Sequence, residues 1–562
     1  MSATATPHEG PTAGEPAPAF QQRLGLFDAT MLVAGTMIGS GIFIVSADIA
    51  RAVGSSGWLL AVWVLTGVMT ILGALCYAEL AAAMPHAGGQ YVYLREAYSP
   101  LWGFLYGWTC FLVIQTGSIA AVAVAFAKFL GVLVPTLGTG EEAILFKHEF
   151  TEPMFVRLPL PWLAEPLTVL KRTEFTLHGG QLVAVAIVTL LTLLNCRGVH
   201  EGKWVQNIFT VAKTLALVLL IVLGLTVAAN TEAIQANSRD LWSGITGTEA
   251  YAEVHKLLHK LLPQAGLLVA LMVAGGAMVG SLFSADAWNN VTFTAGEIRD
   301  PRRNLPRSLV LGVGLVIALY LLANLAYLAV LPLHGDPELA AVLKKEAEAA
   351  STPEARAAVE QKYQEAAFRL GIDQAWDDRV GTAALQLASP HFGVPFMAIG
   401  IMISTFGCVN GMILMGARLY YAMARDRLFF QSVGRLNRQG VPAAGLLLQG
   451  AWSILLIFSG TYSELLDYVI FAALLFYVLT VVGLFVLRQT RPALERPYRV
   501  HGYPVLPAVY VMLCAAIMLD LLIVKPVYTW PGLILVLTGI PVYFVWRLLG
   551  GRGAPAASAP SA

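Results

Sequence analysis

Charged residues are scarce in this chain of 562 residues. Asp, Glu, Lys and Arg make up 13% of it and hydrophobic residues 57%, and the mean hydropathy is +0.67. Soluble domains carry about 25% charged residues, so this composition excludes a soluble protein. The sequence therefore predicts an integral membrane protein.

Cysteine is also scarce, and the cysteines lie far apart along the chain. No two of them fall within four residues of each other, so the sequence has neither the ligand spacing of a metal site nor a disulfide framework. We accordingly expect no metal and no cofactor. The cysteines are Cys76, Cys110, Cys196, Cys408 and Cys514.

The sequence also lacks the signatures of several other function classes. Its net charge is +1 and it offers no soluble basic face, which excludes nucleic acid binding. No nucleophile and base pair falls at membrane depth, so an enzyme is not expected. Residues 1–22 lack the basic region and apolar core of a signal peptide. We expect residues 1–22 and 549–562, both rich in Ala and Pro, to be disordered cytoplasmic tails.

Long apolar runs dominate what remains. Twelve of them reach about 18 residues and could each cross a bilayer. Lys and Arg gather in the connections that would face the cytoplasm if the N-terminus lies there, so we expect both termini inside. The predicted fold is an all-α polytopic membrane protein with twelve transmembrane helices. The runs lie near residues 29–50, 57–83, 101–135, 179–195, 204–229, 264–293, 307–334, 381–416, 443–460, 464–487, 504–524 and 529–548.

Three exterior connections are long, at residues 136–178, 230–263 and 335–380. The third is rich in Ala, Glu, Lys and Leu, which favours one or two helices interrupted near Ser351-Thr352-Pro353. On the inside, residues 86–98 alternate apolar and polar residues at near-helical spacing, as an interfacial helix does.

The first apolar run contains three glycines and two hydroxyl residues within Gly35–Phe43. Clustered glycines destabilise a helix interior, which indicates that the helix opens here. Unwound backbone at membrane depth persists only where it lines a cavity or is buried in protein. Two interpretations remain open from this stretch alone: a substrate site, or close packing of helices through small residues.

The sixth run breaks its pattern in the same way. Its apolar part is followed by Phe283-Ser284-Ala285-Asp286-Ala287-Trp288-Asn289-Asn290. Interrupted spans in corresponding positions of two halves are typical of inverted-repeat transporters. We therefore expect a first five-helix repeat at 23–229, an inverted second repeat at 264–487 that contains the 335–380 insertion, and two further helices at 504–548.

The two breaks offer complementary chemistry. Free N–H groups at Gly39, Ser40 and Gly41 would face a helix N-terminus, which suits a carboxylate. Carbonyl groups released around Phe283, Ser284 and Asp286 would accept from an ammonium group. An anionic and a cationic half-site together match a zwitterionic amino acid.

Several side chains near the breaks have two interpretations. Phe283 could gate the site or simply pack in the core. Asp286 could pair with a cationic substrate, relay a proton, or cap the following half-helix, and we favour the cap. Lys213 stands alone deep in the fifth run, where it could fill a cation site or snorkel to the surface. Ser404, Thr405 and Asn410 form a polar patch in the eighth run, and Arg418 to Arg427 read as an inside loop that anchors the helix end.

Five segments resemble the amino acid, polyamine and organocation superfamily, and within it the L-type amino acid transporter family. They are GTMIGSGIF, YAELAAAMPHAGGQYVYLREAY, GKWVQNIFTVAK, FSADAWNNVTFTAGEIRDPRRNLPR and STFGCVNGMILMGARLYYAMARD. The resemblance implies a LeuT-type fold with a 5+5 inverted repeat and broken helices 1 and 6. It also implies sodium-independent exchange of amino acids.

The same resemblance implies roles for individual residues. The carboxylate would be bound by N–H groups of Gly39, Ser40 and Gly41, and the ammonium by carbonyls of Met37, Phe283 and Asp286. Phe283 would gate the site and Lys213 would replace a sodium ion. The expected pocket is completed by Ile38, Ser284, Asn289 and Asn410.

Two features depart from the family pattern. Ala287 stands where the family has a glycine before the tryptophan, so we expect a tighter second break. Residues 136–178 contain no cysteine, so no disulfide-linked accessory subunit is expected.

The sequence thus predicts a prokaryotic permease of the plasma or inner membrane that exchanges neutral L-amino acids. Two alternatives stay open. One is a proton-coupled symporter of amino acids or polyamines that titrates Asp286 or Glu79, and the other is a nutrient receptor that binds substrate but barely transports it.

Overall fold

The computed structural model describes residues 20–158, 167–258, 266–350, 352–389, 392–458 and 462–550. Nearly all of the two expected tails, residues 1–19 and 551–562, lies outside the described residues.

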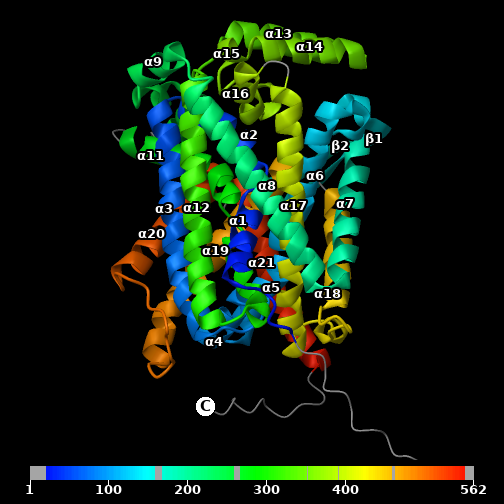
Figure 1. Cartoon of the computed structure of the whole chain (residues 1–562), viewed down its shortest axis with the longest axis vertical. Coiled ribbons are helices and arrows are strands. Elements are labelled where there is room, and N and C mark those ends of the chain that lie inside the picture. The colour runs from blue at the N-terminus through cyan, green and yellow to red at the C-terminus, as the bar shows by residue number, and fades with distance from the viewer. Residues whose placement is uncertain are drawn as a thin grey trace, which may run out of the picture.

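Helices stand side by side as an upright bundle (Figure 1). Within the described residues, ten helical segments are long and apolar enough to cross a membrane. The bent pair α1 (Leu26–Met37) and α2 (Gly41–Val53) makes an eleventh, and the shorter apolar α18 (Ala443–Ile457) brings the count to the predicted twelve. The ten are α3 (Ser56–Ala83), α5 to α6 (Pro100–Leu133), α7 (Gly179–Arg197), α8 (Val199–Thr226), α11 with η5 (Gly266–Glu297), α12 (Pro301–Val330), α17 (Gly393–Arg425), α19 (Tyr462–Thr490), α20 (Val505–Val524) and α21 (Pro526–Gly550).

Apolar side chains cover the outside of this bundle. Leu215, Leu267 and Met512 are among the large hydrophobic residues that are mostly exposed. Contiguous exposed apolar surface on this scale marks contact with lipid, not water. The chain is therefore a multi-pass membrane protein.

Both predicted breaks are present. α1 ends at Met37 and α2 begins at Gly41, with a bend of 40° between them. α11 (Gly266–Ser284) ends before Ala285-Asp286-Ala287, and the chain continues as the 3₁₀ helix η5 (Trp288–Glu297). α11 packs against α2, and α1 packs against α8, α12 and α17, so the two broken spans occupy the middle of the bundle.

The third span is also irregular. α5 (Pro100–Thr109) continues through the π-helical turn η1 (Cys110–Ile114) into α6 (Gln115–Leu133). The predicted interfacial helix is α4 (Gln90–Ala97), whose first five residues are buried against α5 and α19 instead of lying on the surface.

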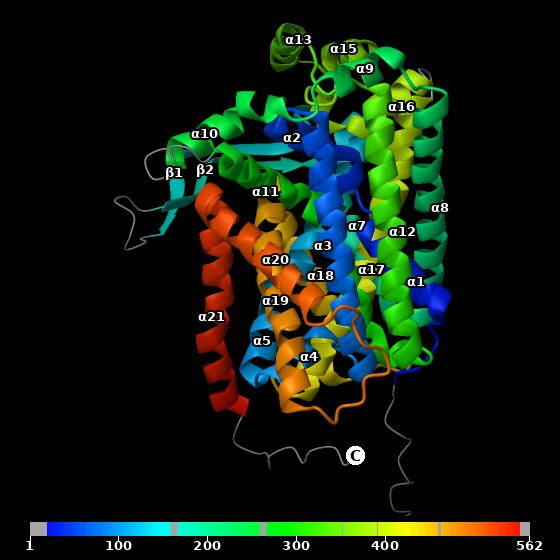
Figure 2. The same ribbon diagram turned by 90° about the vertical axis from the view of Figure 1, so that its left-hand side faces the viewer.

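The exterior connections lie at one end of the bundle, opposite α4 (Figures 1 and 2). As predicted, the third forms two helices with an interruption near residue 351, α13 (Pro337–Ala349) and α14 (Pro353–Glu365). The remaining exterior elements are η2 (Pro135–Leu137), η3 (Glu141–Ala143), α9 (Thr231–Arg239), η4 (Ser243–Gly247), α10 (Glu249–Leu258), α15 (Ala367–Leu370) and η6 (Trp376–Asp378).

The first exterior connection adds something that the sequence did not indicate. It forms an antiparallel hairpin of β1 (Ile144–Leu158) and β2 (Leu167–His178), with Ile144 opposite His178. Figure 2 shows the hairpin at the side of the bundle beside α10.

One predicted span has the wrong bounds. The run at 381–416 divides into α16 (Val380–Ala388) and α17 (Gly393–Arg425), and α17 continues nine residues beyond the predicted end. The expected loop from Arg418 is therefore helical as far as Arg425, and η7 (Gln431–Gly434) follows it before α18.

Candidate binding site at the two broken helices

The two breaks lie against each other. A Cβ atom placed on Gly41 would be 2.0 Å from Ser284 Oγ and 3.2 Å from Ser284 Cα, so only glycine allows this approach. The Tyr320 hydroxyl, from α12, lies 2.8 Å from the Met37 carbonyl oxygen and 3.0 Å from the Ser284 carbonyl oxygen. Glycine packing and a tyrosine bridge thus hold the unwound segments together.

The peptide groups of the first break have a defined orientation. Ser404 Oγ lies 3.0 Å from the Ile38 carbonyl oxygen and 2.9 Å from that of Gly39, so both carbonyls point toward α17. In a trans peptide the N–H group points opposite to the carbonyl, so the N–H groups of Gly39 and Ser40 point away from α17. Among the residues that the structure describes, the N–H groups of Gly39 and Gly41 have no acceptor.

Lys213 places its ammonium group beside the first break. The side chain is 1% exposed, so it does not snorkel. Nζ donates to the carbonyl oxygens of Ile38 at 2.7 Å and Ser404 at 3.1 Å, and also to that of Gly35. The last carbonyls of a helix lack intrahelical partners and carry a partial negative charge. The lysine therefore neutralises the C-terminal end of α1.

The second break contains a strained residue. Ala287 has φ 65° and ψ 2°, in the left-handed region that favours glycine. The Asp286 N–H donates to the Phe283 carbonyl at 3.1 Å, which closes the turn at the end of α11. Ala287, not glycine, thus makes the sharp turn.

Asp286 does not cap η5, which corrects our expectation. The residue before η5 is Ala287, and no side chain caps this helix. The Asp286 carboxylate instead accepts from the Tyr477 hydroxyl, which also lies 3.2 Å from Asn289 Oδ1. Because η5 starts only after the left-handed turn, Asp286 is directed toward α19.

Polar side chains below the second break form a buried network. Asn289 Nδ2 donates to Gln90 Oε1 at 2.8 Å, and Asn290 Nδ2 donates to Gln115 Oε1 at 3.1 Å. Together with Asp286 and Tyr477 these residues line a cavity of about 10 Å³. A cavity of this size holds at most about one water molecule, so the path toward α4 is closed.

Phe283 packs at the boundary between two apolar clusters. It is partly buried and contacts both the main core and the cluster formed by α6, α7, α17 and α18. Both interpretations of this ring, as gate and as core residue, are compatible with that position.

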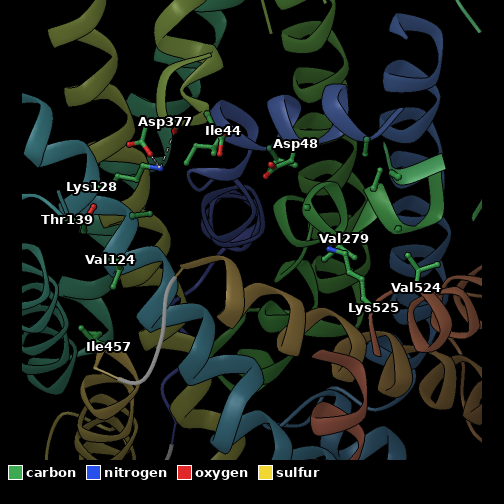
Figure 3. Close-up of a pocket in the computed structure, with 18 of the residues that line it drawn as sticks. Ile44, Asp48, Val124, Lys128, Thr139, Val279, Asp377, Ile457, Val524 and Lys525 are labelled. Carbon is green, nitrogen blue, oxygen red and sulfur yellow. Dashed lines mark hydrogen bonds and ion pairs between the residues drawn. The ribbon is translucent and has the colours of Figure 1, made fainter. Parts of the chain in front are cut away.

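A larger cavity opens above the second break, on the side of the exterior connections. Its volume is about 970 Å³, and its lining includes Ile44, Val124, Val279 and Gly280 (Figure 3). Ser284 Oγ donates to the Gly280 carbonyl at 2.8 Å, so the floor of this vestibule is one helical turn above the break. The structure is therefore open toward the end of the bundle that carries α13 and α14 and closed toward the end that carries α4.

Ion pairs tie the exterior segment at η6 to the vestibule walls. Lys128 Nζ on α6 lies 2.9 Å from Asp377 Oδ1 (Figure 3). Arg51 Nη2 on α2 lies 2.7 Å from Asp378 Oδ1. Burial raises the pKa of Asp378, although Arg51 opposes that shift. Burial also acts to raise the pKa of Asp377, but Lys128 and Arg379 outweigh it and hold this pKa below its usual value.

Asn410 lies in a different hydrogen-bond network. Its Nδ2 donates to the Gly202 carbonyl and to Gln206 Oε1, both at 3.1 Å, and its Oδ1 accepts from Asn195 Nδ2 at 2.9 Å. The structure thus brings Gly39, Gly41, Met37, Ser284 and Lys213 together, whereas Asn410 joins α17 to α7 and α8. A role of Asn410 in the pocket stays a prediction.

Arg418 belongs to the protein interior, which corrects the expected loop anchor. Its Nη2 lies 2.9 Å from Glu297 Oε1, and both side chains are 1% exposed. A buried ion pair of this kind is strongly destabilising to break on one side only. The pair fastens the end of η5 to α17.

Sequence reasoning missed the residues that hold the breaks in place. These are isolated polar residues in apolar runs, and only their depth in the membrane could have singled them out. Their partners come from distant segments that no local pattern predicts. They are Gln90, Gln115, Tyr320 and Tyr477.

Comparison with known proteins agrees with this architecture. The model of the family described as amino acid permease matches residues 24–345 and 370–545. Large neutral amino acids transporter small subunit 2 of Mus musculus is 29% identical over 541 residues, which cover 96% of this chain and 84% of that protein. The b(0,+)-type amino acid transporter 1 of Mus musculus is 28% identical over 94% of this chain and 88% of its own length. Asc-type amino acid transporter 1 of Mus musculus is 29% identical over 94% of this chain and 82% of its own length. The relatives are transporters by name and not enzymes, and the chain belongs to the amino acid permease family of membrane transporters.

Proposed function

We propose that this chain exchanges neutral L-amino acids across the membrane without sodium, by alternating access around the two breaks. The relatives named for large neutral amino acids and for b(0,+)-type and Asc-type transport support an amino acid cargo. The observation that carries the proposal is the pair of opposed breaks with the Lys213 ammonium fixed beside the first one.

The substrate carboxylate binds the N–H groups of Gly39, Ser40 and Gly41. The unused N–H groups of Gly39 and Gly41 support this, as does the position of Gly41 at the first turn of the 13-residue helix α2. A helix N-terminus equals about half a positive charge, so it stabilises an anion without a basic side chain.

The substrate ammonium binds carbonyl oxygens of Met37, Phe283 and Asp286. The Met37 carbonyl already accepts from Tyr320, and the Phe283 carbonyl from the Asp286 N–H. A carbonyl oxygen has two lone pairs, so each of these can accept a second hydrogen bond. Ile38, Ser284, Asn289 and Asn410 complete the pocket in this proposal.

Lys213 supplies the positive charge that a bound metal ion would otherwise provide. Three carbonyl oxygens already accept from its ammonium, so a sodium ion at this position would meet both steric and charge repulsion. This makes transport independent of sodium.

Phe283 gates the path from the vestibule, and two five-helix repeats, 23–229 and 264–487, move against each other. The vestibule of about 970 Å³ supports an exterior entry, and both chain termini face the cytoplasm of a plasma or inner membrane. No cysteine stands in 136–178, so the transporter works without a disulfide-linked accessory subunit.

A proton-coupled symporter is the second candidate, and Asp286 is the observation that favours it. Asp286 is a carboxylate at the break with a hydroxyl partner, and within the described residues it forms no ion pair. Glu79 is less suited, because Arg488 Nη2 lies 2.6 Å from its Oε2 and the Val500 N–H donates to the same oxygen at 2.7 Å.

Ligand stabilisation of the purified protein tests the two-part site. We expect leucine to raise the melting temperature, because a ligand that binds only the native state stabilises it. Leucine methyl ester lacks the carboxylate charge and 4-methylpentanoate lacks the ammonium, so neither should raise it at the same concentration. Equal stabilisation by leucine and either analogue would refute the two-part site.

A further inference from the structure

A second cavity lies at the end of the bundle where α1 begins. Its volume is about 490 Å³, and three separate segments line it. Arg23 precedes α1, Arg197 and Gly198 form the turn from α7 to α8, and Arg438 lies between η7 and α18. None of these residues contributes to the breaks.

The charged residues that line this cavity are mostly arginines. In the part of the chain that the structure describes, Arg23, Arg197 and Arg438 form no ion pair. Glu201 is the one acidic residue of the lining, so three arginines and one glutamate leave a formal charge of +2. All three arginines are exposed, and like charges that share one cavity repel one another unless an anion lies between them.

The residue type indicates which anion fits. Arginine presents planar donors that bind phosphate oxygens in pairs, which makes it the preferred side chain for phosphate recognition. The first N–H groups of the 28-residue helix α8, which starts at Val199 in this lining, add a partial positive charge. Both features select an oxyanion over a neutral molecule.

The cavity also lies at the depth of lipid headgroups. Trp204, one turn further along α8 than His200, is 54% exposed, and the exposed apolar face of the helix continues with Ile208 and Leu215. Exposed tryptophans concentrate at the boundary between lipid tails and headgroups. Arg197, just before α8, therefore lies just outside the apolar layer.

We propose that this cavity binds a phosphate group, supplied by an anionic phospholipid headgroup or by a free phosphate. Basic pockets between transmembrane helices on the cytoplasmic side bind such headgroups in other membrane proteins. Occupancy would tie the segment before α1 to the α7–α8 turn, since Lys203 Nζ already lies 3.3 Å from the Arg23 carbonyl oxygen.

Thermal titration of the full chain in neutral detergent tests the proposal. The probes are dioctanoyl phosphatidylglycerol, dioctanoyl phosphatidylcholine and inorganic phosphate, at constant ionic strength. An arginine near the membrane surface contributes about fivefold to the binding of an anionic lipid. We therefore expect Arg197→Ala with Arg438→Ala to weaken binding about 25-fold.

Arg303→Ala with Arg307→Ala is the matched control. Both arginines lie near the start of α12, are exposed, and form no ion pair in the described part of the chain. The control removes the same charge from the same side of the bundle, so it should bind the probes as the unaltered protein does.

The probes separate the two sources of phosphate. Stabilisation by phosphatidylglycerol alone, lost in the Arg197 and Arg438 variant, supports a headgroup site. Stabilisation by inorganic phosphate alone, lost in the same variant, supports a free phosphate. Equal stabilisation by phosphatidylcholine, absence of any saturable shift, or equal weakening in the control variant would each overturn the proposal.

Discussion

Lys213 is the residue whose chemistry most constrains the transporter. Its ammonium donates to three carbonyls at and beside the end of α1, and removal leaves these carbonyls without their shared donor in a water-poor interior. We predict that Lys213→Ala reduces amino acid uptake by about tenfold or more, a barrier change of about 1.4 kcal/mol or more.

The measurement for this variant is uptake into proteoliposomes at matched protein content, with elution in gel filtration as the test of folding. Lys344→Ala, an exposed lysine on α13, is the control and should behave as the unaltered chain does. Normal uptake kinetics in Lys213→Ala would remove the cation-site role.

Ala287 carries the strain of the second break. A left-handed conformation costs a non-glycine residue about 1–2 kcal/mol. Glycine avoids this cost, but its greater conformational freedom in the unfolded state offsets part of the gain in stability. We predict that Ala287→Gly increases the free energy of unfolding by about 1 kcal/mol and raises the melting temperature. Ala285→Gly, at a buried alanine of the same break without positive φ, should lower it. The reverse order of the two variants would contradict the strain.

At the scale of residues, the sequence predicted how deeply a side chain lies in the membrane better than it predicted which residues that side chain contacts. The position of Lys213 within an apolar run indicated a buried ammonium, because only its distance from the span ends mattered. The partner of Asp286 could not be predicted in the same way, since Tyr477 lies 191 residues further along the chain. The cap expected for Asp286 failed because Ala287 turns the chain before η5 begins.

At the scale of elements, α1–α2 and α11–η5 depend on the close approach of Gly41 to Ser284. An added methyl group at Gly41 would overlap the side chain of Ser284 and press on its backbone, and such overpacking costs about 1–3 kcal/mol. We predict that Gly41→Ala lowers the melting temperature, whereas Gly39→Ala does not, because its nearest new neighbour is Cys408 Sγ at 3.6 Å. Similar melting temperatures for the two variants would show that the breaks do not constrain each other.

Element types followed from hydropathy and helix propensity, whereas some boundaries did not. The helices α13 and α14 were predictable from runs of strong helix formers. The end of α17 was not predictable. An arginine after an apolar run resembles the solvent-exposed end of a helix, and the sequence does not reveal that Glu297 is the buried partner of Arg418. The β1–β2 hairpin was not predicted either. It lies in a connection between apolar runs, and those runs carry no information about pairing within the connection.

At the scale of the whole molecule, the vestibule and the closed side describe one state of a transport cycle. The exterior cavity of about 970 Å³ reaches to within one turn of the break, while the cavity below it holds about 10 Å³. Ion pairs from Arg51 and Lys128 connect η6 to α2 and α6. Movement of α2 relative to η6 therefore requires the Arg51 pair to rearrange, and movement of α6 relative to η6 requires the Lys128 pair to rearrange.

The direct measurement of the central proposal is uptake of radiolabelled leucine into proteoliposomes with and without internal unlabelled leucine. We predict that uptake requires internal leucine, is unchanged when sodium is removed, and does not respond to a pH gradient in vesicles without internal substrate. Binding without any flux would indicate a receptor. Uptake into empty vesicles driven by a proton or sodium gradient would contradict the sodium-independent exchanger.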